Sequence, residues 1–408
     1  MVKLQSYCMV FLFCAAAIIA SPAQSVSFST LASFNGTDGA WPGAPLVQDS
    51  DGSFYGTTLA GGSSPFCQTS PGGCGTVFKM TPSGTLTTIY SFCPSWGCTD
   101  GAQPGGLVRG SDGNFYGTTT RGGAYGDYGT VFKITSAGAL TTLHSFDGGD
   151  GSTPTMLVEA TDGSLYGVTT YGGGYGGGTI FEITPFGAFS SLYGFCSPGC
   201  LDGYAPGTLV QGSDGNFYGT KQYGGANGSG TVFRFILPNQ LTTLYSFCTQ
   251  TNCTDGAAPV GLVQATDGSL YGTTFLGGSP GCTNGCGTVF KITPKYPYTL
   301  RTLYRFDGVH GSWPTVGPVQ GVDGNFYGTT EAGGAGYGTV FKVTPVGTPT
   351  TLHSFCIGGI CNDGYPPFSR LVQARNEFFY GTAQQGGAHN DGTVFSLLPV
   401  RACASCGP

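Results

Sequence analysis

Charged side chains are scarce in this sequence. Of its 408 residues only 9% are Asp, Glu, Lys or Arg, and the formal net charge is -6. Binding to nucleic acid or to an anionic membrane needs clustered basic residues, whereas the 15 Lys and Arg are spread thinly along the chain. The sequence therefore offers no electrostatic surface for either partner. With 39% hydrophobic and 13% aromatic residues the chain still buries a core, which excludes a disordered protein.

Helical periodicity and catalytic motifs are also missing. No stretch sustains an apolar period of 3.6 residues, and 74 glycines interrupt the chain. The glycines follow no Gly-X-Y period, which excludes collagen. No nucleotide-binding loop, zinc-protease motif or Ser-His-Asp order is found. The composition predicts an all-β protein that carries no signature of a known catalytic site.

The N-terminus has the pattern of a signal peptide. Lys3 precedes an apolar run from Met9 to Ala20, which is shorter than the roughly 20 residues that span a bilayer. Ser21-Pro22-Ala23 supplies a small-x-small cleavage site, so residues 1–23 are expected to leave and the mature chain to start near Gln24. No second hydrophobic segment follows. We expect a secreted or extracytoplasmic protein, at the cell surface or in the periplasm, without a transmembrane anchor in the mature chain.

Beyond the leader, the chain repeats. A block of Tyr-Gly, four residues and Gly-Gly occurs with tyrosines at Tyr55, Tyr116, Tyr166, Tyr218, Tyr271, Tyr327 and Tyr380. Gly-Thr-(Val/Ile)-Phe follows each block, and a phenylalanine closes an extended segment at Phe34, Phe92, Phe146, Phe195, Phe247, Phe306 and Phe355. A period of roughly 50 residues repeated in this way indicates a propeller or a solenoid.

One unit, read in detail, contains four short strands. They fall near residues 107–109, 115–119, 129–135 and 140–146. Asp112-Gly113 between the first two is a strong hairpin signal. Val131 and Phe132 are adjacent and therefore face opposite sides of one strand. Because both are apolar, both faces of the sheet are expected to be buried, as in blades stacked around a ring.

The chain ends favour the ring over the solenoid. The last unit stops near Leu398 after its third strand, and a matching fourth strand, Leu31 to Phe34, lies at the other end of the chain. We therefore predict an all-β, seven-bladed β-propeller of four-stranded antiparallel blades, closed by an N-terminal strand that completes the last blade. The predicted propeller covers residues 24–398 and precedes a C-terminal tail, 399–408. Its units are about 46–92, 107–146, 157–195, 209–247, 262–306, 319–355, and 371–398 plus 27–34.

The blocks Tyr-Gly-Thr-Thr, Gly-Gly and Gly-Thr-Val-Phe-Lys-(Ile/Met/Val)-Thr-Pro resemble those of the bacterial GloVer tandem-repeat family. The resemblance covers nearly all of residues 27–398. It implies an exported propeller, usually with a surface anchor, and it implies no particular activity. No C-terminal anchor is visible in this sequence.

Fourteen cysteines remain after the leader, and they fall into close pairs. An even number in an exported protein indicates disulfides. The expected pairs are Cys67/Cys74, Cys93/Cys98, Cys196/Cys200, Cys248/Cys253, Cys282/Cys286, Cys356/Cys361 and Cys403/Cys406. Apart from the tail pair, they occur only in the longest connections, so each bridge is expected to staple its own loop. Zinc binding by Cys403 and Cys406 is the competing interpretation, but no partner pair lies nearby.

Two Asp-Gly series repeat with the blades. The first, which opens hairpins, is Asp51, Asp112, Asp162, Asp214, Asp267 and Asp323. The second begins Asp-Gly-x-x-Pro in the links between blades at Asp38, Asp100, Asp150, Asp202, Asp255 and Asp363, with His310 in the remaining place. A calcium ring is conceivable in the links, but none has the dense Asp-x-Asp-x-Asp-Gly spacing. We expect both series to stabilise turns, and we predict no cofactor.

Residues that depart from the repeat in the long connections are the better candidates for binding. Trp41, Trp313, Glu331, His389 and Asp391 lie in the units that meet at the closure. Tryptophans stack on sugar rings, and a histidine with carboxylates suits acid/base work, although ordinary solvated surface is the competing interpretation. His144 and His353 replace a strand tyrosine and are expected only to fill that position.

These observations favour a non-catalytic binding or scaffold propeller that presents disulfide-stapled loops on one face. The low charge suits a carbohydrate or an extracellular protein as partner. A glycan-directed hydrolase or lyase is one alternative, and a structural surface or adhesion component is another.

Overall fold

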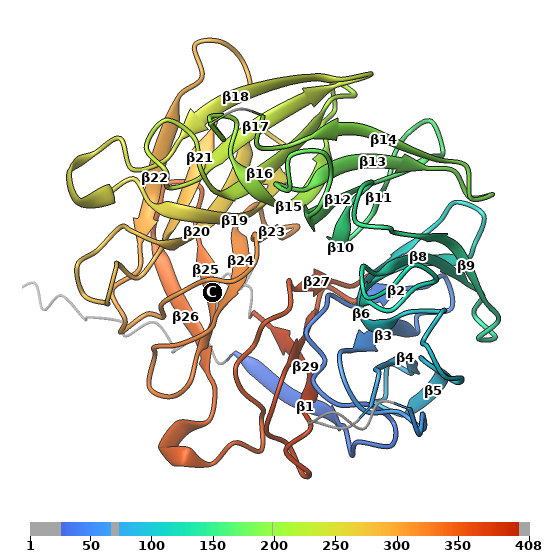
Figure 1. Ribbon diagram of the computed structural model, residues 1–408. Helices are drawn as coiled ribbons and strands as arrows, with labels where there is room; N and C mark the ends of the chain where they lie inside the picture. Colours follow the sequence, from blue (N-terminus) through green and yellow to red (C-terminus); the bar gives the residue numbers. More distant parts are fainter. Residues whose placement is uncertain (1–25, 67–72, 198, 400–408) are drawn as a thin grey trace, which may run out of the picture.

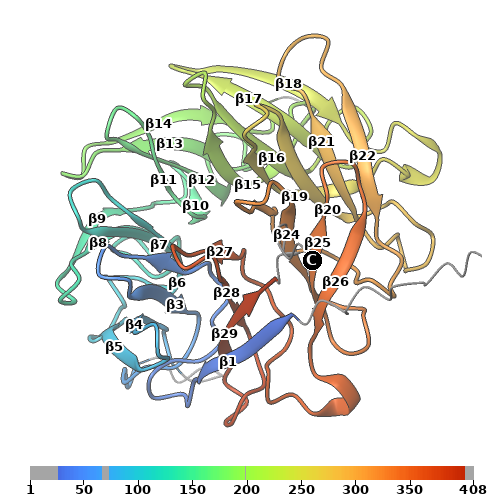
Figure 2. The ribbon, with the colours of Figure 1, turned by 180° about the vertical axis from the view of Figure 1, so that it is seen from behind.

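Seven antiparallel sheets are arranged around a common centre (Figures 1 and 2). The structure is a computed structural model, and it describes residues 26–66, 73–197 and 199–399. Within those ranges the only helical segments are two short 3-10 turns, Thr251–Cys253 and Ile357–Gly359. The predicted all-β, seven-bladed propeller is therefore confirmed. None of the helices in the described ranges is long and apolar enough to cross a membrane.

Each blade runs from an inner strand at the centre to an outer strand at the rim. Blade one comprises β2 (Val47–Gln48), β3 (Phe54–Thr58), β4 (Thr76–Met80) and β5 (Leu86–Ser91); blade two comprises β6 (Ala102–Arg109), β7 (Phe115–Arg121), β8 (Thr130–Ile134) and β9 (Leu140–Ser145). Blade three has an interrupted inner strand, β10 (Ser152–Pro154) and β11 (Val158–Glu159), then β12 (Leu165–Tyr171), β13 (Thr179–Ile183) and β14 (Phe189–Gly194). Blade four comprises β15 (Tyr204–Gln211), β16 (Phe217–Tyr223), β17 (Thr231–Ile236) and β18 (Gln240–Ser246). Blade five comprises β19 (Ala257–Gln264), β20 (Leu270–Leu276), β21 (Thr288–Ile292) and β22 (Leu300–Arg305); blade six comprises β23 (Val319–Gln320), β24 (Phe326–Thr330), β25 (Thr339–Val343) and β26 (Pro349–Ser354).

The two ends of the chain complete blade seven together. It contains β27 (Val372–Gln373), β28 (Phe379–Ala383), β29 (Thr393–Leu398) and the N-terminal β1 (Ser27–Ser33). β1 pairs antiparallel with β29, and the first strand lies beside the last in both views (Figures 1 and 2). The predicted closure is confirmed. The strand extends from Ser27, beyond the core of Leu31 to Phe34 that the repeat indicated, because its pairing with β29 continues to Leu398.

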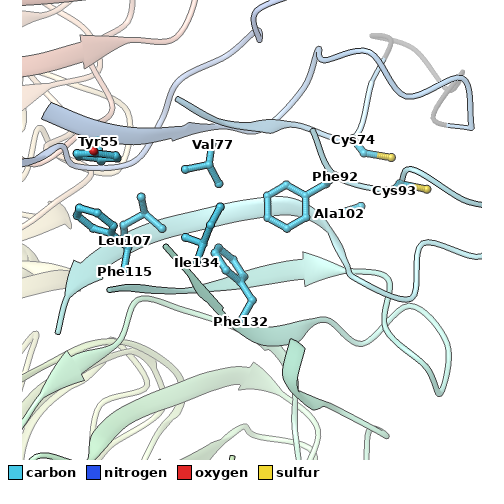
Figure 3. Packing of buried hydrophobic residues seen from close by; sticks show 10 residues of the cluster. All are labelled: Tyr55, Cys74, Val77, Phe92, Cys93, Ala102, Leu107, Phe115, Phe132 and Ile134. Carbon is cyan, nitrogen blue, oxygen red and sulfur yellow. The ribbon is translucent and has the colours of Figure 1, made fainter. Parts of the chain in front are cut away.

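Aromatic side chains fill the spaces between neighbouring blades. Phe92, which follows the outer strand of blade one, meets Phe132 of blade two edge to face at 5.2 Å between ring centroids. Tyr55 stacks on Phe115 across the same interface, and these rings lie in one cluster with Ile134 (Figure 3). The Phe-Phe contact recurs at every interface: Phe146/Phe181, Phe195/Phe233, Phe247/Phe290, Phe306/Phe341, Phe355/Phe395 and Phe34/Phe78. Each such pair contributes about 0.5 to 1.5 kcal/mol beyond the area it buries.

The glycine of each Tyr-Gly block leaves room for this packing. A Cβ at Gly117 would lie 2.5 Å from Cζ of Phe132 and 3.0 Å from Leu107. The same ring therefore rests directly on the backbone of the neighbouring strand. Any larger residue would displace Phe132 from the core.

The links between blades and the loops between second and third strands lie on one end of the ring, which we call the loop face. The backbone N–H of Trp41 donates to the carbonyl of Asp391, and that of Trp313 donates to Cys286. Both tryptophans have positive φ, as do the residues at the same place in four other links: Gln103, Thr153, Ala205 and Ala258. Each of those N–H groups also bonds to the preceding blade. These bonds join each link to its neighbour and hold the loop face together.

Between described residues, five disulfides lie on the loop face: Cys93–Cys98, Cys196–Cys200, Cys248–Cys253, Cys282–Cys286 and Cys356–Cys361. All are between near neighbours in the sequence, as expected of loop staples. Cys67 and the tail pair Cys403/Cys406 fall outside the described residues. Because each ring is small, the chain-entropy model assigns a bridge only about 2 kcal/mol.

Candidate functional site

Trp313 and Glu331 lie together where the chain enters blade six. The N–H of Glu331 donates to the carbonyl of Trp313, and the indole N–H of Trp313 donates to the carbonyl of Gly285 at 3.1 Å. The indole is also close to the ring of Phe275. Burial raises the pKa of the Glu331 carboxyl. Trp313 is thus held by the preceding blade and is only partly accessible to a ligand.

Trp41, His389 and Asp391 form a second group at the closure, where blade seven meets blade one. Trp41 is bonded to Asp391 through the backbone, and His389 is exposed. Burial raises the pKa of the Asp391 carboxyl, nearby Asp38 adds to this shift, and His389 opposes it. Among the described residues no hydrogen bond or ring contact joins this group to Trp313 and Glu331. The five predicted residues therefore make two local groups, one at the junction of blades five and six and the other at the junction of blades seven and one.

The link aspartates act as latches, by which we mean that each carboxylate fastens the link to the outer strand that precedes it through hydrogen bonds. The Asp255 carboxylate accepts from the Tyr245 hydroxyl at 2.7 Å and from the Thr249 backbone at 3.0 Å. Asp100 is bonded in a similar way to Tyr90 and to the backbone of Cys93. His144 and His353 take the place of these tyrosines and contact Asp150 and Asp363. The two histidines do more than fill a strand, because each supplies the partner that the link carboxylate needs.

The link carboxylates do not gather into a cation site. In the described part of the chain, the one group of three or more potential ligand atoms is formed by Cys74, Cys93 and Cys98. Two of these cysteines share a disulfide, which removes them as thiolate ligands. The geometry shows no place where several link aspartates would surround calcium.

The central channel of the ring forms a cavity with a volume of about 560 Å³. All seven blades contribute to its wall through their inner strands or the residues beside them. The wall is mostly apolar, with six threonines, one amide and one arginine. Lining residues include Leu59, Met156, Val210, Thr315, Phe368 and Gln384. A channel of this size and lining is typical of a small-molecule site.

The residues at one equivalent position of the seven blades, on the inner strand or just before it, are arranged around this channel. This position immediately precedes the Leu-Val or Pro-Val pair of each unit and is occupied by Pro45, Gly106, Met156, Thr208, Gly261, Gly317 and Arg370. Six of the seven residues are uncharged. The backbones of Gly261 and Gly317 approach closely, since a Cβ on either would lie 2.7 Å from the other strand. Arg370 is the one charged residue at this position.

Arg370 has no partner. In the described ranges no hydrogen bond or ion pair to its guanidinium is present, and no other residue lining the channel is ionisable. Burial alone lowers the pKa of Arg370, without any contribution from a neighbouring charge. A guanidinium still remains charged at neutral pH. The channel therefore holds one uncompensated positive charge.

Comparison of the repeats at this register would have pointed to Arg370. The sequence prediction sought departures from the repeat only in the long connections, whereas Arg370 lies two residues before the inner strand β27. Trp41 and Trp313 stand two residues before Gly43 and Thr315, which line the channel. None of the five predicted residues lines the channel itself.

Lys221 is a second buried cation that the sequence analysis did not single out. It replaces the threonine that other blades use to bond a threonine on the next strand, as Thr119 does with Thr130 at 2.9 Å. Its Nζ lies 4.9 and 4.8 Å from the ring centroids of Phe195 and Phe233, without a hydrogen-bond partner. Burial lowers its pKa to about 7, against the opposing charge of Asp202. Lys221 does not line the channel.

Several exposed tyrosines are found on the loop face of blades two to four. They are Tyr125, Tyr171, Tyr175, Tyr204 and Tyr223. Tyr204 and Tyr223 stack on each other at 5.3 Å between centroids. These rings follow no rule that the repeats share, and their exposure could not be read from the sequence.

The repeats match a known family model. The model of the Gloeobacter/Verrucomicrobia repeat matches residues 64–282 and 245–403. The match bears out the resemblance that the Tyr-Gly-Thr-Thr and Gly-Thr-Val-Phe blocks indicated. No curated protein matches the chain.

Among solved structures, similar folds occur in proteins of low sequence identity. The extracellular domain of a hybrid two component system from B. thetaiotaomicron is 9% identical with a TM-score of 0.57, over 90% of this chain and 39% of that one. PorZ, a surface component of the type-IX secretion system of Porphyromonas gingivalis, is 13% identical with a TM-score of 0.50, over 88% and 47%. This chain thus spans less than half of either protein. A gluconolactonase from Xanthomonas campestris, 12% identical over 72% and 85%, reaches a TM-score of only 0.45. These likenesses concern the fold alone.

Proposed function

This chain belongs to the Gloeobacter/Verrucomicrobia repeat family, and we propose that it is an exported, non-catalytic binding propeller that takes a small ligand into its central channel. The observation that carries the proposal is the channel itself. It is lined by all seven blades, and its volume of about 560 Å³ is suited to a small organic molecule. The leader-like N-terminus and the disulfides support export.

The wall of the channel favours binding over catalysis. General acid/base work needs a titratable group within hydrogen-bond reach of the substrate. Arg370 is the sole ionisable residue among those described along the wall, and an arginine does not exchange protons near neutral pH. A hydrolase or lyase would require an acid and a base here. The two carboxylates predicted as site residues, Glu331 and Asp391, belong to separate groups, and neither lines the channel.

A thermal-shift screen of the purified protein against small neutral and weakly charged compounds tests this proposal. A ligand at 100 times its Kd stabilises the folded state by about 2.7 kcal/mol, so a hit raises the Tm. Met156→Trp and Thr208→Phe, which both place bulk in the channel, should abolish the shift. Val346→Trp adds a similar bulk at an exposed turn and should leave it unchanged. Hits that ignore both filled channels, or a screen without hits, would contradict channel binding.

The exposed tyrosines favour a second candidate, a neutral glycan held on the loop face. Tyrosine rings stack on sugar rings, and their hydroxyls bond to sugar hydroxyls. No basic cluster competes for this surface, since charged residues are only 9% of the chain. Glycan-array binding that Tyr175→Ala and Tyr204→Ala weaken, and that Met156→Trp leaves intact, would establish this surface as a glycan site. A glycan bound equally well by all three variants would rule it out.

A further inference from the structure

Resting on the proposed function, we propose that Arg370 binds the carboxylate of a small organic acid whose apolar body fills the central channel. The proposal starts from symmetry. Seven blades place seven residues at one register around the axis, and six of them are uncharged. The fold therefore does not need a cation at this position. Pro45, Thr208 and Gly317 show that a small neutral residue serves the same place in a blade.

An unpaired charge in this location is costly without a ligand. Burying an ion in a mostly apolar environment is unfavourable unless an opposite charge or hydrogen bonds compensate it. No described acceptor bonds to the guanidinium of Arg370, and no carboxylate lines the channel. Arg109, by contrast, is paired with Asp49 at 2.6 Å. The environment of Arg370 is therefore that of a residue suited to bind an anionic ligand.

The shape and charge of the site select a carboxylate. A guanidinium presents two parallel N–H donors that match the two oxygens of a carboxylate. One positive charge balances one carboxylate, whereas a phosphate monoester carries close to two negative charges at neutral pH. Along the described wall there is no second cation to share that excess. A monocarboxylate is therefore better matched than a phosphate.

The other residues that line the channel indicate the chemical character of the rest of the ligand. Met156, Leu262 and Phe368 offer apolar surface on the wall of the same channel. Gln384 and Thr208 offer a few polar atoms. An aliphatic or aromatic body would bury apolar area against these side chains, at about 25 cal/mol per Å². The ligand class is thus a small acid with a largely hydrophobic body.

Calorimetry with matched acid and amide pairs tests the assignment. The probes are octanoate, 4-phenylbutyrate and indole-3-acetate, each compared with its primary amide. We expect at least one acid to bind tenfold or more tightly than its amide. Arg370→Met should remove this preference and weaken binding of the acid roughly tenfold to a hundredfold, the usual range for a charged hydrogen-bonded contact. Arg370→Lys should retain part of the preference, since the charge stays and the paired donors are lost.

Stability separates loss of the site from loss of the fold. Arg370 is partly buried, and Arg370→Met removes a charge without a described partner, so its Tm should equal or exceed that of the wild type while acid binding falls. If acids and amides bind equally and Met156→Trp abolishes both, the assignment of Arg370 is wrong and the channel remains the binding site. If none of the six probes binds, or Arg370→Met leaves acid binding unchanged, the carboxylate proposal is overturned. The neutral compounds of the thermal-shift screen then decide the proposed function independently.

Discussion

At the scale of single residues, those that recur in every blade have structural roles, and those that depart from the repeat are candidates for other roles. The hairpin aspartates illustrate the first kind, since Asp112 accepts from the buried Tyr116 hydroxyl at 2.8 Å and from Lys133 at 2.8 Å. Similar Tyr-Asp bonds recur in other blades, for example between Tyr166 and Asp162. A residue that recurs with the same contacts serves the blade. Arg370 and Lys221 break the repeat and gain no described hydrogen-bond partner in return.

Lys221→Thr should stabilise the protein. The substitution removes a buried amine and restores the threonine pair with Thr231, whose hydroxyl now lacks a partner. The pKa of Lys221 is lowered to about 7 from its ordinary value of 10.5, so between these pH values the unfolded chain binds a proton that the folded chain lacks. The stability of the wild type therefore rises from about pH 7 to pH 10, and the penalty is complete below pH 7. We expect a gain on the order of 3 kcal/mol at pH 7 that shrinks toward pH 10.

Urea unfolding at both pH values measures this gain. Lys291→Thr is a matched control, because Lys291 is partly exposed and its ammonium bonds to Asp267 at 2.8 Å. That surface pair is worth only about 0 to 1 kcal/mol, so the control should be neutral or slightly destabilising. A Lys221→Thr protein that is less stable than the wild type at pH 7 would show that the amine is compensated.

Residue types in the repeat predicted the turns, yet not the charged residues of the interior. The sequence shows that Lys221 departs from Tyr-Gly-Thr-Thr, but it does not show how deeply the side chain lies. Likewise, the partnership of His144 with Asp150 depends on how the link folds back onto the outer strand. Contacts between a strand and a link depend on the three-dimensional structure and could not be predicted from the sequence. The roles of residues that recur in every repeat could be predicted from the sequence alone.

At the scale of strands and loops, prolines explain where the blades differ. The inner strands of blades one, six and seven are only two residues long, β2, β23 and β27. Each is preceded by two prolines within a few residues, as in Pro366-Pro367 before β27. Proline has no N–H for the sheet ladder, so pairing with the second strand is interrupted. Short extended runs and the Asp-Gly hairpin signal predicted four strands per blade, and the lengths of the inner strands were not predicted.

Removing one loop staple should loosen a loop and leave the sheet intact. The double variant Cys248→Ser/Cys253→Ser opens a ring of few residues, for which the chain-entropy model gives a loss of about 2 kcal/mol. Asp255 still bonds to Tyr245 and to the backbone of Thr249, so the link keeps its latch. We expect a lower Tm and an unchanged strand signal in circular dichroism. A variant that unfolds outright would mean that the bridge holds more than its own loop.

At the scale of the whole molecule, stability depends on closing the ring. Every blade packs its aromatic residues on two neighbours, and Phe34 supplies the contact between blades seven and one. Repetition made this architecture predictable, because seven equal units and a split last unit fit a closed ring and no open array. What the sequence could not predict was the central channel. The character of its wall depends on residues from all seven blades, which are neighbours around the axis but lie far apart along the chain.

Deleting residues 24–36 should open the ring. β29 would lose its partner and present an unpaired edge, and the faces of blades seven and one would be exposed. We expect aggregation or loss of the cooperative melt, measured by calorimetry. Phe34→Ala keeps the strand and removes one buried ring, so it should cost about 3 to 5 kcal/mol and leave the melt cooperative.

A circular permutant is the matching rescue. Ser27 is the register partner of Leu398, so a short turn from Leu398 into Ser27 should restore β1 as a continuous hairpin. This permutant should melt like the wild type. Failure of the permutant, together with a deletion variant that stays folded, would show that β1 is dispensable.

The pairing of Ser27 with Leu398 also determines how the molecule responds to a mechanical load. Tension applied through the segments before β1 and after β29 acts on two adjacent, antiparallel strand ends. Such a load opens the ladder one pair at a time, in the manner of a zipper, and does not shear all the pairs at once. Blade seven is then the first part of the ring to yield, and its opening removes one wall of the channel, the wall that carries Arg370. A protein tethered at both ends would release a bound acid under tension before its other six blades came apart.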